Sequence, residues 1–146
     1  MSFVRIERLR ARGSEAGRAC GACTACCTVM AVTELRKPSR RACEHVGRDG
    51  CRAHDARPES CRAFFCAWMR GAMAADEALR PDALGVMVDW FTTRATGESH
   101  LLAFEVWPGA FDSAEARAVL AELARAQELR LSHRDGSWSV FASDDG

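Results

Sequence analysis

Residues 85–91, GVMVDWF, decide the fold class, because their apolar side chains recur at every second position. Val86, Val88 and Trp90 would lie on one face of an extended chain, since successive side chains of a strand point to opposite faces. A period of two predicts a β-strand rather than a helix. The C-terminal half should therefore contain a sheet built outward from this stretch.

The residues that follow supply the partners of this strand. HLLAFEVW (residues 100–107) has the same alternation, and WPG closes it as a turn. Asp112 and Glu115 form a D-x-x-E capping box, which predicts a helix through about Gln127. We expect one face of this second strand and one side of the helix to be buried, with these apolar residues: Leu102, Phe104, Val106, Val119, Leu120 and Leu123.

A β-hairpin should end the fold at residues 129–141. Leu129 and Leu131 alternate before a turn at Asp135-Gly136, and Trp138 and Val140 alternate after it. The class is then α+β, with a small antiparallel sheet and one or two helices. On this sheet, alternation predicts that four polar residues are exposed to solvent: Asp89, His100, Glu105 and His133.

Upstream of residue 70 the composition changes. At 146 residues the chain is one domain's worth of protein. We divide it into a cysteine-rich metal-binding region, 1–70, and an α+β part, 71–146, packed together as one compact unit. Residues 1–12 could form a short opening strand, and residues 29–37 favour a helix ended by Pro38.

All eight cysteines lie in the first region. They are Cys20, Cys23, Cys26, Cys27, Cys43, Cys51, Cys61 and Cys66. The N-terminus lacks the apolar core of a secretory signal, so we expect a cytoplasmic, reducing location, where disulfides are rare. Residues 38–58 carry almost no apolar side chains and cannot build a hydrophobic core, whereas a bound metal can fix such a segment.

The run CGACTACC (residues 20–27) is the densest group of thiols. Its C-x2-C spacings let two thiolates converge on one ion at about 2.3 Å. On a helix, the adjacent Cys26 and Cys27 would diverge by about 100°. Such neighbours suit two sites better than one, so we expect more than one ion. Spacing does not decide how the eight cysteines pair, or whether His45 or His54 replaces one of them.

These motifs resemble a known family. CGACTACC, then CEH (residues 43–45), then CRAHDARPESCRAFFCAW (residues 51–68) are similar to the bacterial CxxCxxCC family of zinc- or iron-chelating proteins (YkgJ-type). The resemblance covers roughly residues 18–70, and RPD (residues 80–82) extends it. It implies that the cysteines are the chelating set. His54 stands where the family usually has tyrosine, which leaves its role open.

Zinc is the metal we expect, because thiolate softness and the Irving–Williams order favour it over divalent iron. C-x2-C-x2-C also forms part of a ferredoxin run, so an iron–sulfur cluster is the alternative. No H-E-x-x-H, phosphate-loop or Ser-His-Asp pattern is present, and an excess of thiolates fits chelation, storage or transfer better than catalysis. The function hypotheses are thus a metal-chelating protein, an iron–sulfur oxidoreductase component, and a zinc-stapled module that docks an unidentified protein partner.

The charge distribution bears on other partners. Residues 1–66 hold 13 Lys and Arg against 7 Asp and Glu, and the remainder reverses this balance. A basic half can bind nucleic acid, but aromatic residues are not interleaved with the arginines as stacking surfaces require. We expect the arginines to balance buried thiolates instead. No apolar run reaches the length that crosses a bilayer, so no membrane partner is expected.

Overall fold

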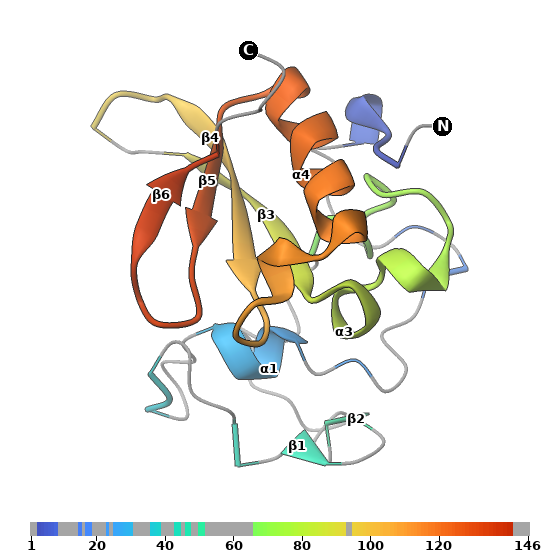
Figure 1. Cartoon of the computed structure of the whole chain (residues 1–146), viewed down its shortest axis with the longest axis vertical. Helices are drawn as coiled ribbons and strands as arrows, with labels where there is room; N and C mark the ends of the chain where they lie inside the picture. Colours follow the sequence, from blue (N-terminus) through green and yellow to red (C-terminus); the bar gives the residue numbers. More distant parts are fainter. Residues whose placement is uncertain are drawn as a thin grey trace.

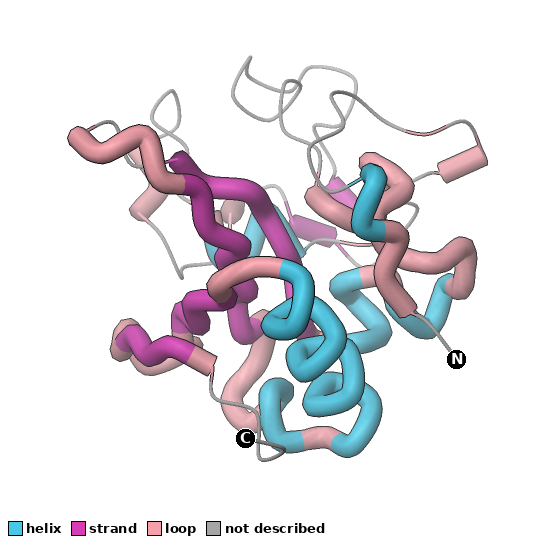
Figure 2. The backbone as a smooth tube through the Cα atoms, turned by 90° about the horizontal axis from the view of Figure 1, so that it is seen from above, coloured by secondary structure: helices cyan, strands magenta, loops and turns pink. Residues whose placement is uncertain are grey.

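A computed structural model of the chain shows a four-stranded sheet with a helix lying along one face (Figures 1 and 2). The structure describes residues 3–8, 15, 17, 18, 23, 25–30, 36–38, 43, 44, 46, 47, 50, 51, 66–92 and 95–141. The α+β class expected from the sequence is confirmed for this part of the chain.

The four strands follow the predicted positions closely. They are β3 (Val86–Thr92), β4 (Ser99–Glu105), β5 (Leu129–Ser132) and β6 (Trp138–Val140), and they lie side by side in that order. β3 pairs with β4 and β5 with β6 in antiparallel fashion, but β4 and β5 are parallel. The prediction of an antiparallel sheet is therefore wrong for the central pair. The chain leaves one end of β4, returns through a helix and enters β5 in the same direction, which is how parallel strands are joined.

That returning helix is α4 (Ala114–Ala126). Its N-cap is Ser113, whose Oγ accepts a hydrogen bond from the Ala116 backbone N–H at 3.0 Å. The cap thus lies one residue after the predicted Asp112, which ends a short 3-10 helix, η5 (Ala110–Asp112). The apolar side of α4 is as predicted, because these residues have no exposed surface: Val119, Leu120 and Leu123.

Along β4, the apolar residues of the two faces differ in burial. In register across β3, β4 and β5 lie Val88, Ala103 and Leu131, which are all buried. The opposite face of β4 carries Leu102 and Phe104, which are only half-buried. The prediction selected this second set on β4, which is the less buried one. Both sets on β4 are largely apolar, so the alternation could not show which one faces the helix.

Two of the polar residues predicted to be exposed are buried. Glu105 is buried, and its carboxylate accepts hydrogen bonds from the backbone N–H groups of Phe111 at 3.3 Å and Arg134 at 2.9 Å. His100 is also buried, with Nδ1 2.6 Å from a carboxylate oxygen of Glu128. Both side chains contact polar groups from other parts of the chain, and these contacts offset the free-energy cost of removing a polar side chain from water.

The N-terminal residues pack against α4 and residues 70–74 rather than forming a strand of their own. Val4 makes an isolated antiparallel bridge with Met73, and the chain then turns into the 3-10 helix η1 (Ile6–Arg8). The carboxylate of Glu122 on α4 accepts the backbone N–H groups of Phe3 at 2.7 Å and Val4 at 3.1 Å. The predicted opening strand is therefore wrong for residues 3–8, and its remaining positions lie outside the described residues.

Shorter elements lie within the cysteine-rich segment, residues 20–66, and between this segment and the sheet. They are α1 (Ala25–Val29), the paired strands β1 (Val46–Gly47) and β2 (Gly50–Cys51), the 3-10 helix η4 (Glu77–Leu79) and α3 (Pro81–Leu84). α1 lies near one end of the sheet, on the side of α3 (Figure 1). Of the predicted helix over residues 29–37, Val29 is the last residue of α1 and Arg36 has a left-handed φ of 53°, so neither Met30 nor Arg36 is helical. Residues 31–35 lie outside the described residues.

Candidate functional site

The structure places some of the predicted metal ligands and not others. Four cysteine side chains are described: Cys23, Cys26 and Cys43 are half-buried and Cys66 is buried, and none of the four is in a disulfide. Cys27 and Cys51 are described only as backbone, in α1 and β2. The remaining predicted or alternative ligands lie outside the described residues: Cys20, Cys61, His45 and His54.

Cys26 is held by the helix that carries it. Ala25 and Val29 are 2% and 1% exposed and belong to the main hydrophobic cluster, so one side of α1 is anchored in the core. A five-residue helix is marginal without such packing. At its end, the buried ammonium of Lys37 donates to the backbone carbonyl oxygens of Met30 and Pro38. A cation there satisfies carbonyl oxygens that have no partner within the helix.

Cys23 precedes α1 and has several polar neighbours. The backbone N–H groups of Ala25 and Asp82 lower the pKa of its thiol, whereas the negative charge of the Asp82 carboxylate raises it. Burial, with further contributions from Asp82 and Cys66, raises the pKa of the Cys23 thiol to about 11. Cys23 is therefore a neutral thiol near pH 7 in the metal-free protein, and a metal must displace its proton to bind the thiolate.

Cys66 comes from the far end of the cysteine-rich segment and is the most buried of the described cysteines. The next residue, Ala67, donates its backbone N–H to the Val88 carbonyl of β3 at 2.8 Å, which fixes this turn to the sheet edge. The Cys66 thiol lies near enough to Cys23 to raise its pKa.

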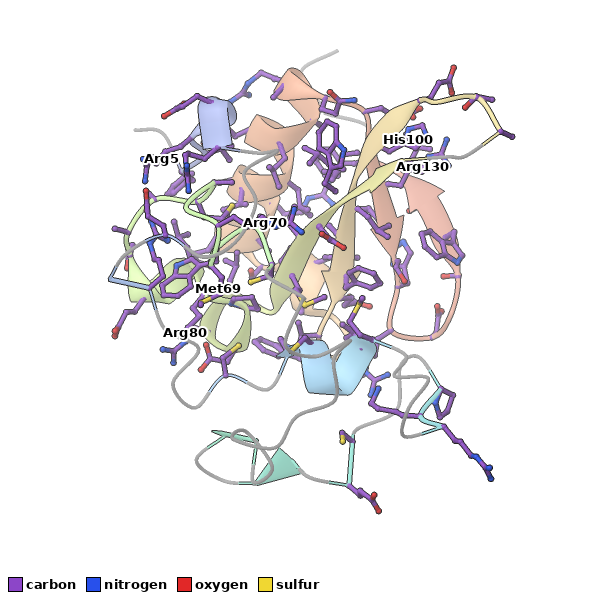
Figure 3. The ribbon with its side chains drawn as sticks, turned by 180° about the vertical axis from the view of Figure 1, so that it is seen from behind. Arg5, Met69, Arg70, Arg80, His100 and Arg130 are labelled. Carbon is purple, nitrogen blue, oxygen red and sulfur yellow. The ribbon has the colours of Figure 1, made fainter. Side chains whose placement is uncertain are left out.

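Asp82 is fixed by an arginine of the same short segment. Arg80 Nε and Nη2 donate to the two Asp82 carboxylate oxygens at 2.6 and 2.8 Å. This fork holds the pKa of the Asp82 carboxyl below its usual range. Figure 3 shows Arg80 at the end of the molecule where α1 lies. The sequence marks RPD only as part of the family resemblance. The position of Asp82 relative to Cys23 depends on tertiary folding, so no pattern of neighbouring residues predicts it.

The described cysteine side chains and Asp82 do not form a complete metal site. Among the described side chains, no group of three or more His, Cys, Asp or Glu is arranged to hold an ion. Asp82 and Cys66 both raise the pKa of the Cys23 thiol through their negative charge. The donor chemistry nevertheless suits a thiophilic ion, because backbone N–H groups already point at a cysteine sulfur.

Three described arginines near the N-terminus contact groups other than thiols. Arg5 donates to both carboxylate oxygens of Glu15 at 2.9 and 3.0 Å. Arg8 donates to the Arg70 carbonyl, and Arg18 donates to the carbonyls of Trp68 and Met73. Arg5 and Arg70 lie on the side of the molecule seen in Figure 3. Arg8 and Arg18 thus link the N-terminal segment to residues 68–73, and the Arg5 guanidinium is paired with the Glu15 carboxylate.

Comparisons with protein-family models, curated proteins and solved structures found no match for this chain. In the part of the chain that the structure describes, no helix is both long and apolar enough to span a membrane.

Proposed function

We propose that this protein binds a transition metal ion, zinc in preference to iron, through thiolates of the cysteine-rich segment. The observation that carries the proposal is that the four described cysteine side chains, which come from both ends of that segment, are all free thiols. Two backbone N–H groups directed at the Cys23 sulfur support it, because such donors stabilise a thiolate once metal has displaced the proton. The resemblance to the CxxCxxCC family of chelating proteins supports the same chemistry.

The number of thiols favours chelation, storage or transfer over Lewis-acid catalysis. A structural zinc ion takes four ligands, whereas the segment offers eight thiols. A catalytic zinc also keeps an open position beside a general base. We therefore propose more than one ion per chain, held either to stabilise the fold or to be passed on.

The test is metal analysis of protein purified without added chelator, together with its visible spectrum. We expect a colourless protein with about two zinc ions per chain. Cobalt substitution should give an intense sulfur-to-cobalt charge-transfer band, which Cys23→Ser and Cys66→Ser each weaken. His133→Gln is the control, because His133 lies on the β5–β6 hairpin and contacts Ser139 at 2.7 Å rather than a cysteine.

The other outcomes choose among the alternatives. A brown protein containing iron and acid-labile sulfide would replace zinc chelation with an iron–sulfur cluster. A chain that retains neither zinc nor cobalt under reducing conditions would refute metal binding. A band that survives both serine substitutions would show that other ligands hold the ion.

A further inference from the structure

The two edges of the four-stranded sheet differ in what lies beside them. At β3, the Val88 carbonyl accepts the backbone N–H of Ala67 at 2.8 Å, and Asp89 pairs with Arg70 at 3.1 Å. β6 forms the other edge (Figure 1), and all three of its residues are exposed. β6 is therefore the edge of the sheet that a further strand can reach.

β6 carries apolar side chains where sheet edges usually carry charge. Trp138 and Val140 are 57% and 60% exposed, and they lie on one face of the strand because they are two residues apart. In the described part of the chain they are two of the three exposed large apolar side chains, the other being Trp107. Native proteins blunt a sheet edge with charged residues or proline, and β6 (Trp-Ser-Val) contains neither. This composition suits pairing with another strand.

The backbone of β6 is oriented for such pairing. His133 donates its backbone N–H to the Ser137 carbonyl at 2.9 Å, so Ser137 belongs to the residues that bond to β5. In antiparallel strands these residues alternate with residues whose N–H and C=O groups point the other way. Ser139 therefore faces β5, whereas the N–H and C=O groups of Trp138 and Val140 point toward the outer side of the sheet.

A second copy of the same strand fits this edge. When two copies of β6 run antiparallel with Ser139 facing Ser139, Trp138 of each copy lies opposite Val140 of the other. Both residues point their backbone groups outward, so this pair exchanges hydrogen bonds across the interface. It also joins an aromatic to a β-branched side chain, a combination that stabilises antiparallel sheets. Because β6 is uncharged, the two strands bring no like charges together.

We propose that two copies of this chain associate through β6 in this register and join their sheets into one. The inference is independent of the proposed metal binding, because β6 lies in the α+β part and contains no candidate ligand. A strand of three residues buries less than the roughly 1,600 Å² of a standard interface. Since interfaces of that standard size span micromolar to picomolar affinity, we expect a dissociation constant above about 1 µM.

The first experiment is sedimentation equilibrium of the full chain under reducing conditions, from about 10 µM to about 1 mM. The average mass of the wild type should rise toward that of a dimer. Val140→Pro should weaken association at least about tenfold, because each copy loses an outward N–H donor. Trp138→Lys should weaken it similarly by placing a charge on the edge. Trp107→Lys, the same change at an exposed tryptophan outside the strands, should match the wild type.

The second experiment tests the register by cross-linking. In Ser139→Cys the two introduced thiols face each other with Cα atoms about 4.5 Å apart, within reach of a disulfide. In the control, Ser137→Cys, the two thiols lie four residues apart along the paired strands, about 13 Å, which is beyond that reach. After mild oxidation and tryptic digestion, mass spectrometry should find residues 135–146 linked to their own copy in Ser139→Cys only. This peptide contains no native cysteine, so other disulfides do not interfere.

The outcomes decide the proposal directly. A wild type that stays monomeric over the whole concentration range overturns it. Association that Val140→Pro and Trp138→Lys leave unchanged shows that another surface holds the copies together and also overturns it. Equal cross-linking of Ser139→Cys and Ser137→Cys, or none in either, overturns the register centred on Ser139.

Discussion

Replacing Gly85 with alanine should destabilise the fold, because this position has both a special backbone conformation and no room for a side chain. Gly85 ends α3, immediately before β3, with a left-handed φ of 82°. A Cβ atom there would lie 2.6 Å from the Cβ of Ala110 and 2.8 Å from the nearest ring atom of Trp107. These contacts are shorter than van der Waals packing allows, so one of the neighbours must move.

The cost has two parts that the structure allows to be separated. The left-handed conformation costs an L-residue about 1–2 kcal/mol. Forcing a methyl group into filled space costs about 1–3 kcal/mol more. Alanine recovers about 0.4–1 kcal/mol by restricting the unfolded chain. We therefore expect Gly85→Ala to lower the free energy of unfolding by about 2–4 kcal/mol.

Gly109 provides a matched control. Its φ is also 82°, but a Cβ built on it has no other atom within 4 Å. Gly109→Ala should cost only the backbone part, about 0.5–1.5 kcal/mol. Urea unfolding of both variants, followed by tryptophan fluorescence, gives the difference directly. If the two variants unfold at the same urea concentration with the same slope, the steric part of this reasoning is wrong.

Three further predictions concern the polar contacts. The folded-state pKa of the Cys23 thiol is raised from 9.0 to about 11, so its contribution to the free energy of unfolding is present below about pH 9 and is lost as pH rises toward 11. Urea unfolding of metal-free protein should therefore show a lower stability at pH 10.5 than at pH 8. The Cys23→Ser variant should lack this contribution of Cys23 to the loss. Glu122→Ala should destabilise by about 1.5–3 kcal/mol and speed amide exchange at Phe3 and Val4, whereas unchanged exchange would contradict the role of its carboxylate. Lys37→Met should cost about 1–3 kcal/mol in thermal unfolding by leaving carbonyl oxygens at the end of α1 unpaired, and a stability equal to wild type would argue against that cap.

The strands and the long helix were predictable because their signals are local. The alternation around Val86 and Val88, the hairpin turn at Asp135-Gly136 and the apolar side of α4 all follow from residues near one another in sequence. The parallel pairing of β4 with β5 was not predictable in this way. The parallel pairing depends on the end of the sheet at which the chain leaves α4 and enters β5. No single stretch of sequence predicts that end.

The buried polar residues show the same limit. Alternation assigned Glu105 and His100 to solvent, but backbone N–H groups from η5 and the β5–β6 turn reach Glu105, and Glu128 reaches His100. A carboxylate is buried only where such partners exist. Those partners come from distant parts of the chain, so the local pattern could not reveal them.

The sequence by itself determined that thiol chemistry dominates residues 20–66 and that an α+β part follows, because residue type and periodicity are written in the chain. Only the tertiary structure decided that Cys66 is buried while Cys23, Cys26 and Cys43 stay half-buried, and that burial raises the pKa of the Cys23 thiol to about 11. Cysteine spacing limits which thiols can converge within one turn. Contacts between separate segments depend instead on how α1, α3 and the edge of β3 pack, since that packing fixes the distances between them.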